Sequence, residues 1–303
     1  MSFLKRFFYF GLVNILVIAS ISVVASIINV FFFGSAYPPS SIMSLMVMSL
    51  VWGSGGAFIS LMISKWMAKR AMGVQVIDPK TATSSEREFL ETVHRLARAA
   101  HLPAMPEVGV YSSPEVNAFA TGPSKSNSLV AVSSGLLQSM DRDQVEGVLG
   151  HEIAHIANGD MVTMTLLQGI INSFVIFFSR IIASAVAGDR DGRRSSGGMQ
   201  FLLVMALQIV FGFLGNMAIA AFSRGREFRA DRGGALYAGR QKMISALEAL
   251  DRKSQMAGPL AVTDDKFAAF KISNQKRGGL MALFSTHPPL TERIEKLRNT
   301  PLS

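Results

Sequence analysis

Cysteine is missing from the 303-residue chain. Its absence excludes a disulfide framework and any metal site with thiolate ligands, and it is compatible with a reducing compartment. Charged residues are also scarce, at 17% of the chain, and none lies between Arg6 and Lys65. Because 49% of the residues are hydrophobic and the mean hydropathy is +0.33, we exclude an ordinary soluble domain and predict a membrane protein with a soluble part.

Acidic residues are fewer than basic ones, 21 against 30, which gives a formal net charge of +9. A basic excess suits either nucleic acid or a surface of anionic lipid. The sequence contains no nucleic-acid motif and no interleaving of aromatic with basic residues. We therefore predict the lipid bilayer as a partner and no nucleic acid.

Two long uncharged runs begin the chain, and a short turn that contains Pro38 and Pro39 joins them. Residues 7–33 and 42–63 are each long enough to cross a bilayer as a helix. The first run is too long for a cleaved signal peptide, so we predict a retained anchor. Lysine and arginine flank the hairpin on both sides and the turn carries no charge, which places both ends in the cytoplasm by the positive-inside rule.

Two further uncharged runs, residues 161–179 and 199–222, predict a second membrane hairpin. Glutamine and asparagine make these runs less lipophilic than the first pair, so the alternatives to lipid contact are that these polar residues face each other or a cavity. The connector, residues 189–198, carries three arginines, which conflicts with the positive-inside rule for an external loop. Two explanations are open: nearby aspartates and later translocation dilute the rule, or these segments only dip into the membrane. The predicted parts are two membrane hairpins, 1–68 and 161–222, and two soluble parts, 69–160 and 223–303.

The soluble parts predict an α+β fold with a small β-sheet beside the α-helical membrane segments. Residues 108–111 and 128–133 are rich in β-branched side chains and are bounded by proline, serine or glycine. Residues 117–122, between these two runs, fit an edge strand of the same sheet. The sequence therefore predicts three short strands ahead of the next helix.

Two helices of the soluble parts carry signals for their ends. Ser85 and Glu88 match a capping box at the start of an amphipathic helix. A later helix, residues 226–250, contains the adjacent glycines Gly233 and Gly234, at which we expect a break.

One helix contains the pattern His-Glu-x-x-His, and the sequence predicts that Asp141 caps this helix and that Gly159 ends it. Because an α-helix turns about 100° per residue, His151 and His155 present two imidazoles to one spot, at a spacing that suits one zinc ion. Glu152 is placed to take a proton from a water at the zinc, since zinc lowers the pKa of that water to about 7. Two surface histidines on an amphipathic helix are the alternative interpretation.

A catalytic zinc site needs a third protein ligand and one open position. Since no cysteine is available and His287 is the only later histidine, the third ligand is His287 or a carboxylate. Glu227 and Asp231 lie four residues apart on a predicted helix and so share one face. Glu227 can bind zinc while Asp231 accepts the free N–H of a ligating histidine, and ion pairs with nearby arginines are the alternative. His287 would then be free to donate a hydrogen bond to the oxyanion of a tetrahedral intermediate.

Four motifs, in the right order, resemble the HtpX family of membrane-embedded heat-shock zinc metalloproteases of bacteria. They are NAFATG from residue 117, GHEIAHIANGD from residue 150, EFRAD from residue 227 and THPP from residue 286. The resemblance runs from the N-terminal hairpin to the last helix. It implies a gluzincin-type zincin domain with an active-site helix, about four transmembrane helices, one Zn²⁺ per chain, and a catalytic domain on the cytoplasmic side of the bacterial inner membrane.

The resemblance also implies an activity and the roles of single residues. The activity is endoproteolysis of misfolded or damaged membrane proteins, as part of stress-related quality control. Asn117 would lie on the edge strand that pairs with the substrate backbone. The implied roles are metal ligands for His151, His155 and Glu227, general base for Glu152, ligand orientation for Asp231, transition-state stabilisation for His287, and a weaker candidacy near the site for Arg293.

Two other functions are compatible with the same sequence features. A dedicated processing protease with one or few substrates would use the same zinc chemistry. A metal-stabilised scaffold or chaperone would not turn over substrate, but a structural metal site closes its fourth position and needs no base such as Glu152. We therefore predict an enzyme, and the sequence leaves its substrate range and its oligomeric state open.

Overall fold

The computed structural model describes residues 42–187, 197–256 and 283–301. The predicted first membrane segment, residues 7–33, and most of the arginine-containing connector lie outside these ranges. The described elements are α2 (Ile42–Ala71), β1 (Gln75–Val76), α3 (Ser84–Ala99), β2 (Glu107–Tyr111), β3 (Ala118–Ser124), β4 (Asn127–Ser133), α4 (Ser134–Ser139), α5 (Arg142–Asn158), α6 (Asp160–Ala187), α7 (Gly197–Tyr237), α8 (Arg240–Met256) and α9 (Leu290–Asn299).

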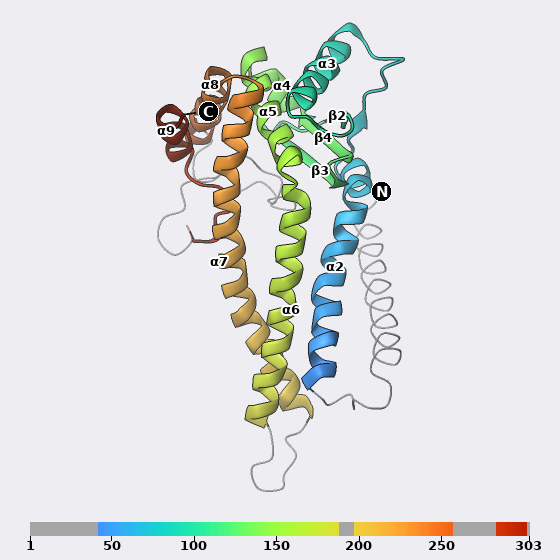
Figure 1. The fold of residues 1–303 in the computed structure, drawn as a ribbon, viewed down its shortest axis with the longest axis vertical. Helices are drawn as coiled ribbons and strands as arrows, with labels where there is room; N and C mark the ends of the chain where they lie inside the picture. The colour runs from blue at the N-terminus through green and yellow to red at the C-terminus, as the bar shows by residue number, and fades with distance from the viewer. Residues whose placement is uncertain (1–41, 188–196, 257–282, 302–303) are drawn as a thin grey trace. The chain divides into compact units, whose positions relative to one another are not determined.

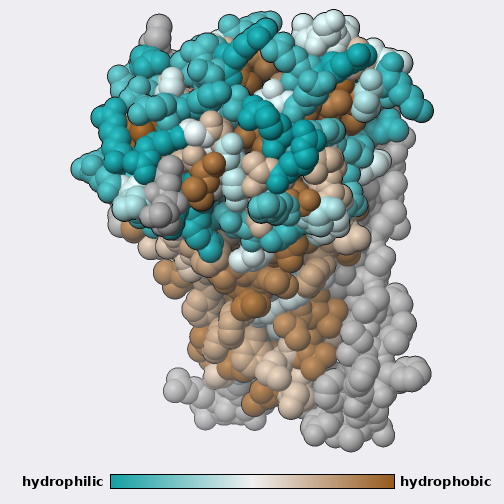
Figure 2. All heavy atoms as spheres, turned by 45° about the horizontal axis from the view of Figure 1, so that its top comes forward, coloured by the Kyte–Doolittle hydropathy of each residue, from teal (hydrophilic) through white to brown (hydrophobic). Residues whose placement is uncertain are grey.

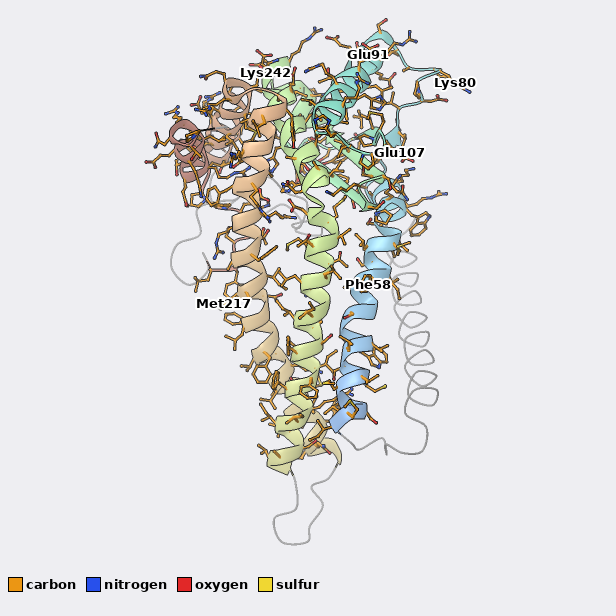
Figure 3. The ribbon with its side chains drawn as sticks, viewed as in Figure 1. Phe58, Lys80, Glu91, Glu107, Met217 and Lys242 are labelled. Atoms are coloured by element: carbon orange, nitrogen blue, oxygen red, sulfur yellow. The ribbon has the colours of Figure 1, made fainter. Side chains whose placement is uncertain are left out.

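Three helices in the described part of the chain, α2, α6 and α7, are long and apolar enough to cross a membrane. Hydrophobic side chains gather on their outer surface (Figure 2). Phe58 of α2 is 45% exposed, which suits a side chain in contact with lipid (Figure 3). The structure thus has the predicted fold class, an α-helical membrane protein with a small mixed sheet, with three of the four expected spans in the described residues.

The described residues divide into two compact units. One contains residues up to Ser60 together with Thr165–Met217, and the other contains Leu61–Met164 together with the described residues from Ala218 onward. The first unit packs its helices closely through small residues, since a Cβ added at Gly53 of α2 would collide with the backbone of Ser173 on α6. The predicted fourfold division of the chain stays a prediction.

The second unit contains a four-stranded mixed sheet in the order β1-β2-β4-β3. Figure 1 labels three of its strands, β2, β4 and β3. β2 and β4 are parallel, whereas β1 pairs with β2 and β3 pairs with β4 in antiparallel fashion. β4 has a continuous run of buried residues because it lies inside the sheet and is covered on both faces. β3 lies at the edge of the sheet, as residues 117–122 predict.

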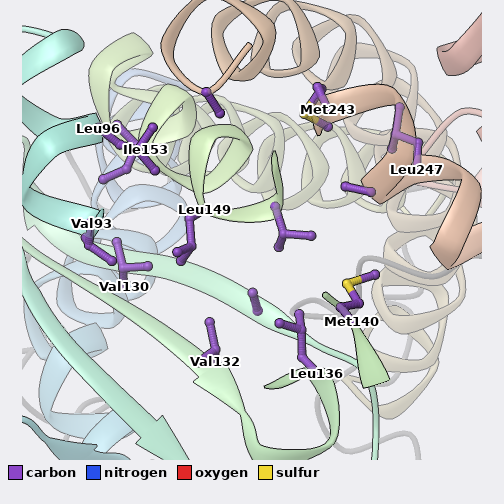
Figure 4. Close-up of a cluster of buried hydrophobic side chains, with 14 of the residues drawn as sticks. Val93, Leu96, Val130, Val132, Leu136, Met140, Leu149, Ile153, Met243 and Leu247 are labelled. Carbon is purple, nitrogen blue, oxygen red and sulfur yellow. The ribbon is translucent and has the colours of Figure 1, made fainter. Parts of the chain in front are cut away.

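A single hydrophobic core joins one face of the sheet to the helices that carry the candidate site (Figure 4). Val130 and Val132 of β4 face Leu149 and Ile153 of α5, and none of the four has accessible surface. Burial of such a side chain contributes about 1.5–3 kcal/mol. The same core includes residues of α3, α8 and α9: Leu90, Val93, Leu96, Ala97, Met243, Ala246, Leu247, Leu250, Leu290, Ile294 and Leu297.

Two predictions about helix ends are wrong. The capping box at the start of α3 uses Thr83 and Glu86, two residues before the predicted pair, because the chain turns at 78–82 and enters the helix earlier. α7 does not break at Gly233–Gly234 but continues to Tyr237, and Gly239, whose φ is +103°, lies between it and α8. The paired glycines serve a close contact between helices.

Candidate metal site

The two motif histidines lie on α5, a helix whose ends match the sequence prediction. Asp141 and Gln144 form a capping box at its start, and Gly159 ends it with a φ of +71°. His151 and His155 are both buried, with 3% and 9% of their surface exposed. Their Nε2 atoms are 3.1 Å apart and therefore point at the same spot.

Glu227 on α7 completes the cluster from a distant part of the sequence. Its Oε2 lies 3.4 Å from Nε2 of His151, and its Oε1 lies 3.3 Å from Nε2 of His155. One ligand atom from each of the three residues falls within 4.8 Å of the others, and all three residues are buried. Two imidazole nitrogens and one carboxylate oxygen are a donor set found in catalytic metal sites, so the cluster fits a divalent metal ion.

Glycines allow α7 to come close enough to α5 for this cluster to form. A Cβ added at Gly234 would lie 2.9 Å from the backbone nitrogen of His151. A Cβ added at Gly150 would lie 2.9 Å from Cβ of Ala238 and 3.1 Å from the carbonyl oxygen of Gly234. Real Cβ atoms do not approach that closely, so the two helices touch through their backbones at this level. Glu227 and Asp231 precede this contact on the same helix and reach the histidines because of it.

Asp231 and Arg293 form a buried ion pair behind His151. Oδ1 of Asp231 is 2.9 Å from Nδ1 of His151. Arg293 of α9 donates from Nε and Nη2 to the two oxygens of Asp231, at 2.8 and 2.6 Å, and its side chain is fully buried. The weaker sequence candidate thus lies inside the site, where its guanidinium neutralises a buried carboxylate.

Asp160 is a site residue that sequence reasoning missed. Its Oδ2 lies 2.6 Å from Nδ1 of His155, and the residue is only 2% exposed. A residue five positions after His155 would lie about 140° around a continuous helix, so helical spacing gives no hint of the contact. The positive φ of Gly159 turns the chain and returns Asp160 to the side of the histidine. The aspartate after Asn-Gly at the end of the motif was the only available signal.

His287 also lies beside the cluster. Its Nδ1 is 2.8 Å from Oε2 of Glu227. Arg224, one turn before Glu227 on α7, donates to the carbonyl oxygens of Leu283 and Ser285, at 3.3 and 2.9 Å. The hydroxyl of Ser285 donates to the carbonyl oxygen of His287 at 2.7 Å. These bonds attach the segment before α9 to the helix that carries Glu227.

Glu152 and Asn117 are both buried, at 5% and 4% exposure. Glu152 follows His151 directly on α5. Asn117 immediately precedes the edge strand β3, where its N–H donates to Oγ of Ser133 and its carbonyl oxygen accepts from the N–H of that residue. The contacts recorded for the described residues do not link Asn117 to the histidine cluster, so its role at a substrate stays a prediction.

The charges of the site favour cationic partners for the carboxylates. Burial opposes a charged imidazole, but hydrogen bonds with Asp231 and Glu227 outweigh burial and raise the pKa of His151 to about 9. Burial and the neighbouring histidine oppose the charge on His155, whereas Asp160 and Glu227 outweigh them and raise its pKa. The buried carboxylates of Asp160, Glu227 and Asp231 therefore favour positive charge at the two imidazoles, which a divalent cation would supply.

Comparisons with known proteins agree on one family. The model of Peptidase family M48 matches residues 83–301. The chain is 52% identical over 300 residues to a protease HtpX homolog of Bacillus licheniformis, a match that covers 97% of this chain and 98% of that protein. It is also 52% identical over 300 residues to protease HtpX of Xanthomonas oryzae pv. oryzae, covering 97% of each.

A solved structure supports the fold. The crystal structure of S. mikatae Ste24p superposes with a TM-score of 0.65 at 16% sequence identity. The match covers 97% of this chain but 65% of that chain, so this chain spans about two thirds of the length of Ste24p. At this identity the likeness concerns the fold alone.

Proposed function

Because the chain belongs to peptidase family M48, it is a membrane metalloprotease, and we propose that it is a zinc-dependent endopeptidase that hydrolyses misfolded or damaged membrane proteins. The observation that supports the proposal most strongly is the buried cluster of His151, His155 and Glu227 with Glu152 beside it. The similarity to HtpX proteases along 97% of the chain supports the proteolytic activity.

The proposed ligands are the three residues of the cluster, which leave one coordination position for water or substrate. When bound, zinc supplies a Lewis acid that polarises the peptide carbonyl and lowers the pKa of water. Glu152 takes the proton from the attacking water and delivers it to the leaving amine nitrogen. His287 donates a hydrogen bond to the oxyanion, and Asp231 holds Nδ1 of His151.

Asn117 and Arg293 have supporting roles in this proposal. Asn117 stands at the start of the edge strand β3, and an exposed edge can accept an extended peptide as an added strand. Arg293 lies 3.6 Å from Oε2 of Glu227 and neutralises part of the acidic charge at the site. Asp231, Glu227 and Glu152 outweigh the effect of burial and raise the pKa of Arg293, so its guanidinium remains charged.

Replacement of the base tests the mechanism directly. We expect Glu152→Gln to retain zinc and to lose peptide hydrolysis by about 10²–10⁴-fold, since an amide cannot accept the proton. Zinc content by elemental analysis and cleavage of an unfolded membrane-protein substrate are the two measurements. A Glu152→Gln protein with near wild-type turnover would exclude the proposed mechanism.

The proposed location is the inner membrane of a bacterium, with the catalytic part in the cytoplasm. Because the chain has no cysteine, single introduced cysteines report topology without background. Cysteines near residue 1, at Arg142 and near residue 303 should be protected from an impermeant reagent in intact cells, and one at Pro38 should react. Labelling near residue 303 from outside would contradict this orientation.

The range of substrates separates a broad protease from a dedicated one. A Glu152→Gln protein that keeps its metal should bind substrates without cleaving them. Identification of the proteins that it retains, against a control that also lacks Glu227, would count those substrates. Many unrelated membrane proteins would support quality control, whereas one or a few would support a dedicated processing protease.

A further inference from the structure

We propose that Asp160 is a positioning residue for the metal ligand His155 and that it fastens the first turn of the membrane helix α6 to the metal site. The inference rests on the proposed function, since it concerns how the same site holds its metal. It starts from the short contact of 2.6 Å between Oδ2 of Asp160 and Nδ1 of His155, in which both residues are buried.

The contact selects the nitrogen that His155 presents to the metal. A neutral imidazole has one N–H and one lone pair, so an acceptor at Nδ1 places the N–H there and leaves the lone pair on Nε2. Nε2 of His155 lies 3.3 Å from Oε1 of Glu227 and 3.1 Å from Nε2 of His151, so it points into the cluster. The carboxylate thus fixes both the tautomer and the orientation of the ring.

A carboxylate orients each of the two histidines. The two carboxylates belong to different helices, and they differ in whether a buried cation neutralises them. Asp231 on α7 holds His151 and shares its carboxylate with the buried Arg293. Among the described residues, the basic side chain recorded near Asp160 on α6 is Arg229, at 4.0 Å, and it is 60% exposed and therefore well screened. His155 is consequently the main hydrogen-bond partner of Asp160, which agrees with a contact shorter than the one between Asp231 and His151.

Asp160 also connects the metal site to α6, because it is the first residue of that helix. α5 ends at Asn158, Gly159 adopts the left-handed conformation, and α6 begins at Asp160. A single residue therefore separates the metal-binding helix from a 28-residue helix that is apolar enough to cross a membrane. The same carboxylate orients the ligand and holds the first turn of α6 against α5.

The difference in charge balance makes Asp160 the better residue to test. Removal of Asp231 would leave the buried cation of Arg293 without its partner, which is strongly destabilising and would confuse folding with metal binding. Removal of Asp160 leaves no such buried cation. Asp143 provides a matched control, because it is a carboxylate of α5 whose side chain is 69% exposed and contacts Lys242.

The experiment uses the full chain in detergent, with zinc and then cobalt as probes. We expect Asp160→Ala to bind zinc about 10–100-fold more weakly than wild type and to release it faster to a chelator. Asp160→Asn keeps a neutral acceptor at the same place and should recover part of the affinity. The visible spectrum of bound cobalt should change in Asp160→Ala, since the ligand field changes, and should be unchanged in Asp143→Asn.

The outcomes distinguish this inference from the proposed function. Wild type without metal affinity would overturn the proposed function itself. Wild type that binds zinc, with wild-type affinity and cobalt spectrum in Asp160→Ala, would overturn the role of Asp160 alone. An equal loss in Asp160→Ala and Asp143→Asn would also overturn it, as the effect would not be specific. If Asp160→Ala does not fold, the nearly isosteric Asp160→Asn decides by the same measurements.

Discussion

The helices α5 and α7 meet at the metal site but are organised by different forces. α5 has 17 residues, a side-chain cap at its start, a backbone cap at its end, and two ligands brought together by helical spacing alone. α7 has 41 residues, and its acids reach the histidines only because the helix packs against α5 at Gly150 and Gly234. One half of the site is therefore local in sequence, and the other half depends on tertiary contact.

The largest effect is expected from removal of the third metal ligand, and it tests whether that ligand is Glu227 or His287. Glu227→Ala should reduce bound zinc steeply, because two histidines and water remain. His287→Ala should retain zinc and lower kcat by roughly 10²–10³-fold, as expected for a lost transition-state donor. Elemental analysis of both purified variants makes the comparison. Zinc retained by the first and lost by the second would reverse the assignment and remove Glu227 from the site.

The next prediction breaks the contact between the helices and leaves every ligand in place. Gly234→Ala puts a methyl group against the backbone of His151, and overpacking of this kind costs about 1–3 kcal/mol. We expect weaker zinc binding together with lower thermal stability. Gly225→Ala, on the same helix but in open space according to its surroundings within 4 Å, is the control and should keep wild-type zinc affinity with no loss of thermal stability. Equal behaviour of the two variants would show that the close contact does not hold the site together.

A smaller effect is expected from the link between α7 and the segment that carries His287. Arg224→Ala removes the two donors to the carbonyl oxygens of Leu283 and Ser285. His287 should then be less well placed, and misplacement of a catalytic group lowers kcat by roughly 10–100-fold. Bound zinc should not change, since Arg224 contacts no proposed ligand. Loss of zinc in this variant would show that the segment supports the metal rather than the reaction.

The sequence predicted the features that depend on local spacing and did not predict those that depend on tertiary contact. His151 and His155 were predicted correctly to face one spot because the periodicity of one helix determines it, and the caps at Asp141 and Gly159 are confirmed. The three strands were found within a residue or two of their ends, because β-branched side chains and the turn residues that bound them are also local signals. Glu227 and Asp231 shared a predicted helix face, but their distance to the histidines needed the structure.

The errors and omissions have a physical cause in common. Gly233 and Gly234 were expected to break α7 because glycine is a poor helix former, whereas close packing against Ala154 and Gly150 requires them inside an intact helix. Asp160 was missed because a left-handed glycine, and not helical spacing, places it. The resemblance gave Arg293 only a weaker candidacy, and no sequence pattern links it to its partner Asp231, which is 62 residues away. Each depends on tertiary contacts that periodicity does not contain.

The smallest effect is expected from removal of the N-terminal cap of α5, which tests whether that cap sets the position of His151 and His155. Asp141→Ala removes the cap of α5, and Thr83→Ala removes the matching capping box of α3. Each should lower the free energy of unfolding by about 1 kcal/mol. Neither should change zinc affinity, because His151 lies nearly three turns beyond the cap and the fully buried Leu149 and Ile153 hold that part of the helix in the core. Thermal unfolding and zinc titration of both variants provide the test. A drop in zinc affinity for Asp141→Ala alone would show that the cap, and not the core, sets the position of the histidines.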